Sequence, residues 1–130
     1  MSKLAVIQSV YKNDKPEYLK LSLDSIFNQT YKDFTLFLGI DGPISEGMRR
    51  ILDSVKDERL YIVEKKENKG LAFILNKLLG KCQDRGYGYI ARMDSDDIAV
   101  IDRFEKQIAF LTDNPDIDMV GGAINEIDDY

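Results

Sequence analysis

The sequence predicts an α/β protein built on a mainly parallel sheet with helices on both faces. Along its 130 residues, short apolar runs typical of strands alternate with segments of helical periodicity. The strand-like runs lack polar alternation, which indicates strands that are buried on both faces. Polar residues gather just after several of these runs, at the strand ends where such sheets bind ligands. We therefore expect one Rossmann-like domain over residues 1–130.

The first half of the chain predicts three strands and two helices. Strands are expected over residues 4–9, 34–40 and 60–63, where the chain is almost entirely apolar. The first helix begins at Pro16, because proline suits the first helical turn, and the second begins near Ser45. Each helix carries one apolar face. These faces are Leu19, Leu23, Ile26 and Phe27 in the first, and Met48, Ile51, Leu52 and Val55 in the second.

The second half predicts two more helices and two more strands. A helix follows Gly70, a strand covers residues 89–93, and a further helix begins near Asp102 and ends before Pro115. Asp102 is the expected N-cap, because the apolar face starts just after it. The apolar faces are Leu71, Leu75, Leu78, Leu79 and Cys82 in the first of these helices, and Phe104, Ile108 and Leu111 in the second.

Met119-Val120 is expected to begin a fifth strand. Residues 125–130 follow it without a closing helix or a polar tail. This ending predicts that the sequence is the N-terminal part of a longer protein, truncated at its C-terminus. A short natural edge strand is the alternative.

Composition excludes several classes of function. The net charge of −5 argues against a nucleic-acid-binding protein, and no apolar run is long enough for a transmembrane segment. The absence of histidine excludes a Ser-His-Asp mechanism and a histidine-bearing zinc site. The single cysteine, Cys82, cannot form an internal disulfide and is expected to be an inert core thiol. The expected location is cytoplasmic, with contact to the cytoplasmic face of the membrane through regions outside this chain.

The most informative segment is Asp94-Ser95-Asp96-Asp97, which follows the strand at residues 89–93 directly. In an extended backbone, residues two apart face the same side, so Asp94 and Asp96 are expected to present oxygens to one point. Carboxylates that lie so close repel each other unless a cation, or a proton shared between them, offsets their charge. Hard ions such as Mg²⁺ or Mn²⁺ prefer such ligands together with substrate phosphates. The segment therefore predicts a metal site for a phosphate-bearing ligand.

Three other interpretations of this region are weaker. The acidic segment could be only a solvated loop that caps the following helix. A calcium-binding loop would need an Asp or Asn and then a glycine where Ile98 and Ala99 stand, so that pattern fails. Residues 86–91 match the letters of a dinucleotide fingerprint, but they precede a strand instead of following one, and we interpret them as a turn.

Six segments in this order resemble the family 2 glycosyltransferases, enzymes of the GT-A fold that use nucleotide-sugar donors. The resemblance covers nearly the whole chain, and the order of the segments makes it specific, whereas a lone Asp-x-Asp would be weak evidence. The segments are residues 6–11, 25–34, Asp41-Gly42, residues 68–72 with Asn76, residues 90–98, and residues 102–107.

The resemblance implies a role for each matching residue. Asp96 would be a direct metal ligand, and Asp94 would face the metal or the ribose, next to Ser95 in the donor-binding segment. Asp41 would accept a hydrogen bond from the base, most often uracil; many relatives carry two acids before the glycine, where this chain has Ile40-Asp41. The rest of the implied donor site comprises Ser9, Val10 and Tyr11 around the base, with Asn68, Gly70 and Asn76 nearby.

The implied reaction moves a sugar from a nucleotide-diphosphate donor, expected to be a UDP-sugar, to a hydroxyl of a saccharide or lipid-linked acceptor. It would depend on Mn²⁺ or Mg²⁺, invert the anomeric configuration and serve the synthesis of a surface polysaccharide or glycolipid. No residue is assigned as the catalytic base, because in this family the base lies in the C-terminal half. We therefore expect the 130-residue chain to bind nucleoside diphosphate with metal but to transfer sugar poorly.

Two alternatives remain open on the sequence. An aspartate-nucleophile phosphatase also uses Asp-x-Asp after a strand, with Asp94 as the nucleophile and Asp96 as the acid. That interpretation leaves the other matching segments unexplained. The second alternative is a non-catalytic nucleotide-binding module.

Overall fold

The computed structural model describes residues 3–122, in which four parallel strands form one sheet. The strand order is β3-β2-β1-β4, and all three neighbouring pairs are parallel. The predicted mainly parallel sheet is therefore confirmed, and the carboxyl ends of its strands lie along one edge. The strands are β1 (Lys3–Val10), β2 (Phe34–Asp41), β3 (Leu60–Lys65) and β4 (Tyr87–Arg92).

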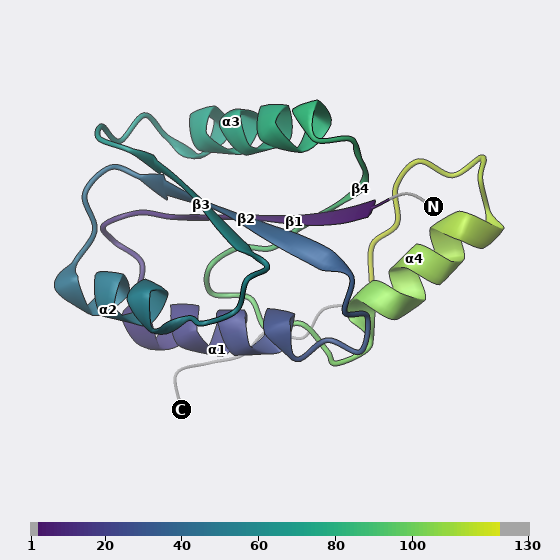
Figure 1. Ribbon diagram of the computed structural model, residues 1–130, viewed down its shortest axis with the longest axis horizontal. Coiled ribbons are helices and arrows are strands. Elements are labelled where there is room, and N and C mark those ends of the chain that lie inside the picture. The colour runs from purple at the N-terminus through teal and green to yellow at the C-terminus, as the bar shows by residue number, and fades with distance from the viewer. Residues whose placement is uncertain (1–2, 123–130) are drawn as a thin grey trace.

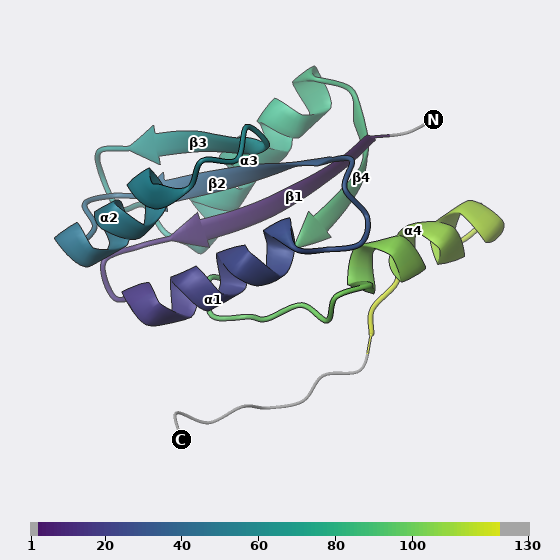
Figure 2. The ribbon, with the colours of Figure 1, turned by 60° about the horizontal axis from the view of Figure 1, so that its bottom comes forward.

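Helices cover both faces of the sheet, as predicted. Figure 1 shows α1 (Pro16–Phe27) and α2 (Glu46–Ser54) below the sheet and α3 (Leu71–Asp84) above it. The fourth helix, α4 (Arg103–Asp113), lies beyond α1 at the β4 side of the sheet in both ribbon views (Figures 1 and 2). The observed starts of all four helices lie within two residues of the predicted ones.

The core consists of two apolar clusters, one on each face of the sheet. Alternate residues of β1 contribute to each, because successive side chains of a strand point to opposite faces. The larger cluster, under α1 and α2, includes Leu19, Leu23, Ile26, Met48, Leu52 and Phe104. The smaller cluster, under α3, contains Ala5, Ile7, Phe37, Leu78 and Cys82.

Cys82 is a buried free thiol of the smaller cluster. Burial raises the pKa of this thiol to about 11, because the apolar surroundings disfavour the thiolate. The thiolate is the reactive form of cysteine. The expectation of an inert core thiol fits this environment.

Two sequence predictions about apolar residues are wrong. Leu71 does not join the buried face of α3: it is 50% exposed, whereas Ile74 is fully buried. Leu71 is the first residue of the helix, at the carboxyl edge of the sheet, where less of the sheet lies beneath it. Met119-Val120 does not start a strand, and Met119 is 88% exposed. The rest of that predicted strand, and the tail at residues 125–130, lie outside the described residues.

Gly39 of β2 allows α3 to approach the sheet closely. A Cβ atom at this position would clash with Cγ1 of Ile74 and lie 3.3 Å from Cδ1 of Leu78. Both of these side chains are fully buried and therefore have little room to move. The absence of a side chain at residue 39 thus sets the distance between α3 and the sheet.

Replacement of Gly39 by alanine is expected to lower the free energy of unfolding by about 1–3 kcal/mol, because it overpacks a filled core. Gly80→Ala is the matched control in α3, since a Cβ there meets nothing within 4 Å. This control is expected to raise stability by up to about 1 kcal/mol, because glycine is a poor helix former. Urea denaturation measures both variants. Equal stability of the two would contradict the packing argument.

Candidate functional site

The strand order reverses between β1 and β4. The chain runs outward from β1 to β2 and β3 with α1 and α2 on one face, and then crosses by α3 on the other face to β4. Parallel α/β sheets bind ligands at the carboxyl ends of the strands where the order reverses in this way. The ends of β1 and β4 therefore define the expected position of a site.

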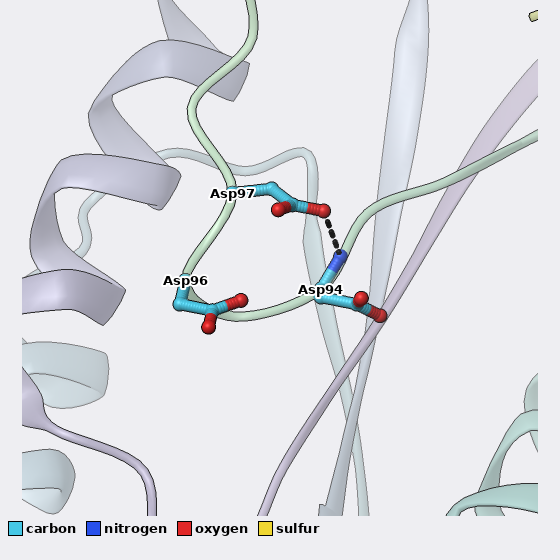
Figure 3. A group of neighbouring side chains, drawn as sticks. All are labelled: Asp94, Asp96 and Asp97. Atoms are coloured by element: carbon cyan, nitrogen blue, oxygen red, sulfur yellow. Dashed lines mark hydrogen bonds between the residues drawn. The ribbon is translucent and has the colours of Figure 1, made fainter. Parts of the chain in front are cut away.

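The segment Asp94–Asp97, called here the acid turn, follows β4. Its backbone is a turn closed by a hydrogen bond of 3.1 Å from the Asp97 N–H to the Asp94 carbonyl. The Asp97 carboxylate in turn accepts a hydrogen bond of 3.3 Å from the Asp94 N–H, as Figure 3 shows. The predicted extended backbone at Asp94–Asp96 is therefore wrong. The turn brings the carboxylates together, and it adds Asp97 to the predicted pair.

The acid turn offers oxygen ligands to a cation. Asp94, Asp96 and Asp97 each present a carboxylate oxygen such that the three oxygens lie within 4.8 Å of one another, and all three residues are exposed. An all-oxygen set that is open to solvent and to substrate phosphates fits Mg²⁺ or Mn²⁺. One positively charged side chain lies nearby, but it offsets little of the negative charge of the three carboxylates. Arg92 contacts Asp94 at 3.4 Å, but both side chains are 55% exposed, and exposed ion pairs contribute little.

A further carboxylate, Asp14, lies next to the acid turn, and the sequence analysis missed it. Its Oδ2 accepts a hydrogen bond of 3.0 Å from the Tyr11 N–H, just past the end of β1. Burial raises the pKa of Asp14, and the charges of Asp96 and Asp94 raise it further, whereas hydrogen bonds from Tyr11 and Ser95 act in the opposite direction. Asp14 therefore links the ends of β1 and β4. Asn13-Asp14, shortly after the end of β1, is a pair of residue types that favour turns.

Asp41, at the end of β2, holds the loop that leads into α3. Its two carboxylate oxygens accept hydrogen bonds of 2.9 Å and 3.0 Å from the backbone N–H groups of Lys69 and Gly70. The side chain of Asn68 donates to the Asp41 carbonyl at 3.2 Å. Gly42 follows with φ of 86°, and a Cβ there would lie 2.7 Å from the Asn68 nitrogen. The loop therefore packs directly on the end of β2.

Asp41 is only 4% exposed, and its carboxylate accepts its hydrogen bonds from backbone N–H groups. Each carboxylate oxygen retains a second lone pair, so an additional hydrogen bond to a base is chemically allowed. That contact stays a prediction. What the structure places here is a buried acid that positions a loop.

The other predicted site residues differ in their availability. Ser9 is half-buried and Tyr11 is 40% exposed at the end of β1. Val10 is 1% exposed and packs in the core, so only its backbone is available to a ligand. Ser95 is 7% exposed within the acid turn. Asn76 is exposed on α3, and no hydrogen bond or ion pair within residues 3–122 joins it to the acid turn or to Asp41.

Two polar residues of the α1 region hold the segment between the acid turn and α4. Gln29 is fully buried; its Nε2 donates to the Val100 carbonyl at 2.6 Å, and its Oε1 accepts from the Phe104 N–H at 3.0 Å. The Ser25 hydroxyl accepts a hydrogen bond of 3.1 Å from the Ala99 N–H. These contacts between distant parts of the sequence could not be predicted from local patterns.

The start of α4 differs from its predicted capping. Asp102 occupies the N-cap position, but its side chain makes no capping hydrogen bond and instead pairs with Lys106 at 3.0 Å. Gln29 satisfies the Phe104 N–H in its place. A side chain from the segment that follows α1 has therefore replaced the local cap.

Comparison with known proteins identifies the family. Residues 6–129 match the family model described as "Glycosyl transferase family 2". The amylovoran biosynthesis glycosyltransferase AmsE of Erwinia amylovora is 35% identical over 127 residues, which cover 97% of this chain and 47% of that protein. The UDP-Gal:alpha-D-GlcNAc-diphosphoundecaprenol beta-1,3-galactosyltransferase of Escherichia coli is 30% identical in an alignment 132 positions long that covers 97% of this chain and 45% of that protein.

Solved structures show the same fold. The S. aureus TarS 1-349 structure in complex with UDP-GlcNAc matches with a TM-score of 0.74 at 19% identity, covering 85% of this chain and 31% of that one. The mannosyltransferase PcManGT from Pyrobaculum calidifontis, in complex with GDP-Man and Mn²⁺, matches with a TM-score of 0.67 at 21% identity, covering 84% of this chain and 32% of that one. The expected GT-A fold is therefore confirmed.

The matches cover nearly all of this chain but only part of each relative. The chain spans about half the length of the curated relatives it matches, with 47%, 46% and 43% of the first three covered. The family model nevertheless covers nearly the whole chain, from residue 6 to residue 129. The chain belongs to glycosyl transferase family 2.

Proposed function

We propose that this chain binds the donor in a metal-dependent, inverting glycosyl transfer from a nucleotide-diphosphate sugar, a UDP-sugar, to an acceptor hydroxyl. The observation that carries the proposal is the position of the acid turn at the reversal of strand order in a chain of this family. The phosphatase alternative has no such support, because it does not account for the match over residues 6–129.

Asp94, Asp96 and Asp97 would hold the ion of the donor site. Bound there, Mg²⁺ or Mn²⁺ would supply positive charge for the diphosphate that leaves when the sugar–phosphate bond breaks. The chain's own contribution is to fix the three carboxylates on one turn, closed by the backbone hydrogen bond between Asp97 and Asp94. A preorganised set of ligands of this kind loses little freedom when donor and ion bind.

The base would lie along the carboxyl edge between the acid turn and Asp41. Asp41 is the last residue of β2 and the acid turn follows β4, and these two strands flank β1. Their ends are not level, because Arg92 pairs with Ile7 whereas Ile40 pairs with Val10. Adjacent strands lie about 4.8 Å apart, so β4 and β2 are about 10 Å apart across the sheet, with Ser9 and Tyr11 at the end of the strand between them. That span suits a nucleotide that lies across the end of β1. Contacts of Ser9, Tyr11 and Asp41 with the base are part of this proposal.

The donor and the acceptor are proposed from relatives. The name of the E. coli relative specifies UDP-Gal and a diphosphoundecaprenol-linked acceptor, and that of the Erwinia relative specifies amylovoran biosynthesis. We therefore propose a UDP-sugar, a saccharide or lipid-linked acceptor, and a cytoplasmic role in surface polysaccharide or glycolipid synthesis. Within residues 3–122, no helix has the length and apolar character needed to cross a membrane.

The choice of base is tested by thermal denaturation with UDP, GDP and ADP, each with and without Mn²⁺. A ligand present at 100 times its Kd stabilises a protein by about 2.7 kcal/mol. We expect UDP with Mn²⁺ to raise Tm by at least about 5 °C, and UDP without the metal to raise it much less.

GDP and ADP with Mn²⁺ are the matched controls, because they carry the same diphosphate. Equal shifts with all three nucleotides would remove the proposed preference for uracil while keeping the diphosphate site. The absence of a shift with any of them would contradict the donor-binding function of this chain.

A further inference from the structure

The side chain of Gln8 is a fully buried amide near the end of β1, a strand whose other buried residues are all apolar. Burying an amide in such surroundings costs stability unless its polar atoms find hydrogen-bond partners. Gln8 lies two residues from Val6 and from Val10, which belong to the cluster under α1, and so it faces that helix. The hydrogen-bond partners of this amide therefore indicate the role of Gln8.

Both hydrogen bonds of Gln8 connect it to the acid turn, one directly and one through Ser22. Its Nε2 donates to the Asp94 carbonyl at 3.1 Å and to the Ser22 hydroxyl at 2.8 Å. Ser22 is itself fully buried on α1, and its hydroxyl lies 3.4 Å from the same Asp94 carbonyl. That carbonyl also closes the acid turn by accepting the Asp97 N–H. The two buried side chains thus hold the first residue of the turn from inside the protein.

The other half of the Gln8 amide has no partner. Within residues 3–122, Oε1 of Gln8 is the one buried side-chain polar atom without a hydrogen bond. An unpaired buried acceptor destabilises the folded state, and an apolar side chain of similar volume would avoid that penalty. Glutamine is therefore a poor choice for stability at this position, whereas its N–H groups are well placed to fix Asp94.

We infer that Gln8, supported by Ser22, is a positioning residue that sets the orientation of the acid turn for the donor's metal and diphosphate. The expected effect of Gln8 on donor affinity rests on the proposed function. The restraint that Gln8 places on the acid turn does not depend on it. Residues that orient metal ligands from behind commonly change metal affinity or activity by about 10- to 100-fold when they are replaced.

The test is Gln8→Met, which keeps the approximate volume and removes all three features: the two donors and the unpaired acceptor. We expect Tm to be unchanged or higher, the amide hydrogen of Asp97 to exchange faster than in the parent, and the affinity for UDP in the presence of Mn²⁺ to fall about tenfold. Ser22→Ala is the second variant. It is also expected to speed the exchange of the Asp97 amide hydrogen and to weaken UDP binding with Mn²⁺, each by a smaller factor than Gln8→Met. Cys82→Ala is the control, a buried truncation under α3 that is expected to lower Tm without either local effect.

The inference is overturned if Gln8→Met lowers Tm and leaves both the Asp97 exchange rate and the UDP affinity unchanged, since Gln8 would then be a structural residue only. A double variant tests whether Gln8 acts through the metal ligands. When Asp96 is already replaced by alanine, Gln8→Met should weaken UDP binding no further. A tenfold loss in that background would also overturn the inference. If the parent chain shows no Mn²⁺-dependent UDP binding, the proposed function fails, and the Asp97 exchange rate alone decides whether Gln8 restrains the turn.

Discussion

Asp96→Ala is expected to weaken UDP binding in the presence of Mn²⁺ by at least about 100-fold, which corresponds to about 2.7 kcal/mol of binding free energy. The substitution removes one of the three clustered carboxylates and leaves Asp94 and Asp97, of which Asp97 is already engaged by the Asp94 N–H. Because Asp96 is exposed, stability should change by no more than about 0.5 kcal/mol. Isothermal titration calorimetry of folded protein measures the loss.

In the absence of Mn²⁺, Asp96→Ala is expected to have no effect on UDP affinity, or the opposite effect. Without Mn²⁺, the Asp96 carboxylate repels a diphosphate, so Asp96→Ala should leave UDP affinity unchanged or slightly higher. Asp53→Ala is the matched control, an exposed acid on α2 that is expected to change neither titration. Equal losses with and without Mn²⁺ would show that Asp96 contributes to folding or nucleotide contact and does not act through a metal.

Gln29→Leu is expected to have the largest effect on stability, lowering the free energy of unfolding by about 2–5 kcal/mol. The leucine is of similar size but has no polar atoms, so the buried Phe104 N–H loses its acceptor, and the Val100 and Ser25 carbonyls each lose one donor. An unpaired buried group costs about 1–3 kcal/mol, and each further hydrogen bond lost costs about 0.5–1.5 kcal/mol. Chemical denaturation measures the change.

Asn28→Ala is the control for this substitution, because Asn28 is exposed at the end of α1 and next in sequence. A change of no more than about 0.5 kcal/mol is expected there. Amide exchange near Phe104 should rise in Gln29→Leu, because that N–H loses its acceptor. A stability loss below about 1 kcal/mol would mean that water or another side chain replaces the glutamine.

The fold could be predicted from the sequence largely because its signals are local. Apolar runs, Pro16 and the periodic helix faces are each read from a few neighbouring residues, and they identified all eight observed elements. Leu71 shows the limit of this approach. Its spacing matches a buried face, but whether the sheet extends beneath the first turn of α3 depends on tertiary structure.

The site could be predicted in composition but not in geometry. Asp94 and Asp96 are recognisable from their residue type and spacing, whereas the turn that also recruits Asp97 depends on hydrogen bonds within the folded chain. Gln8 and Gln29 gave no local signal. Gln8 bonds to Asp94, 86 residues away, and Gln29 bonds to Val100 and Phe104, 71 and 75 residues away, so only the packed structure shows these contacts.

We propose that the acid turn holds the ion that accompanies the nucleotide diphosphate, and paramagnetic broadening by Mn²⁺ tests this placement. In a ¹⁵N-labelled sample with UDP, substoichiometric Mn²⁺ should broaden the amide signals of residues 94–97 first. Tyr87, at the opposite end of β4, is the internal reference, about 20 Å away along the strand. Loss of the signals of residues 94–97 at Mn²⁺ levels that leave the Tyr87 signal intact is the predicted result. Persistence of those signals while others disappear would contradict the claim.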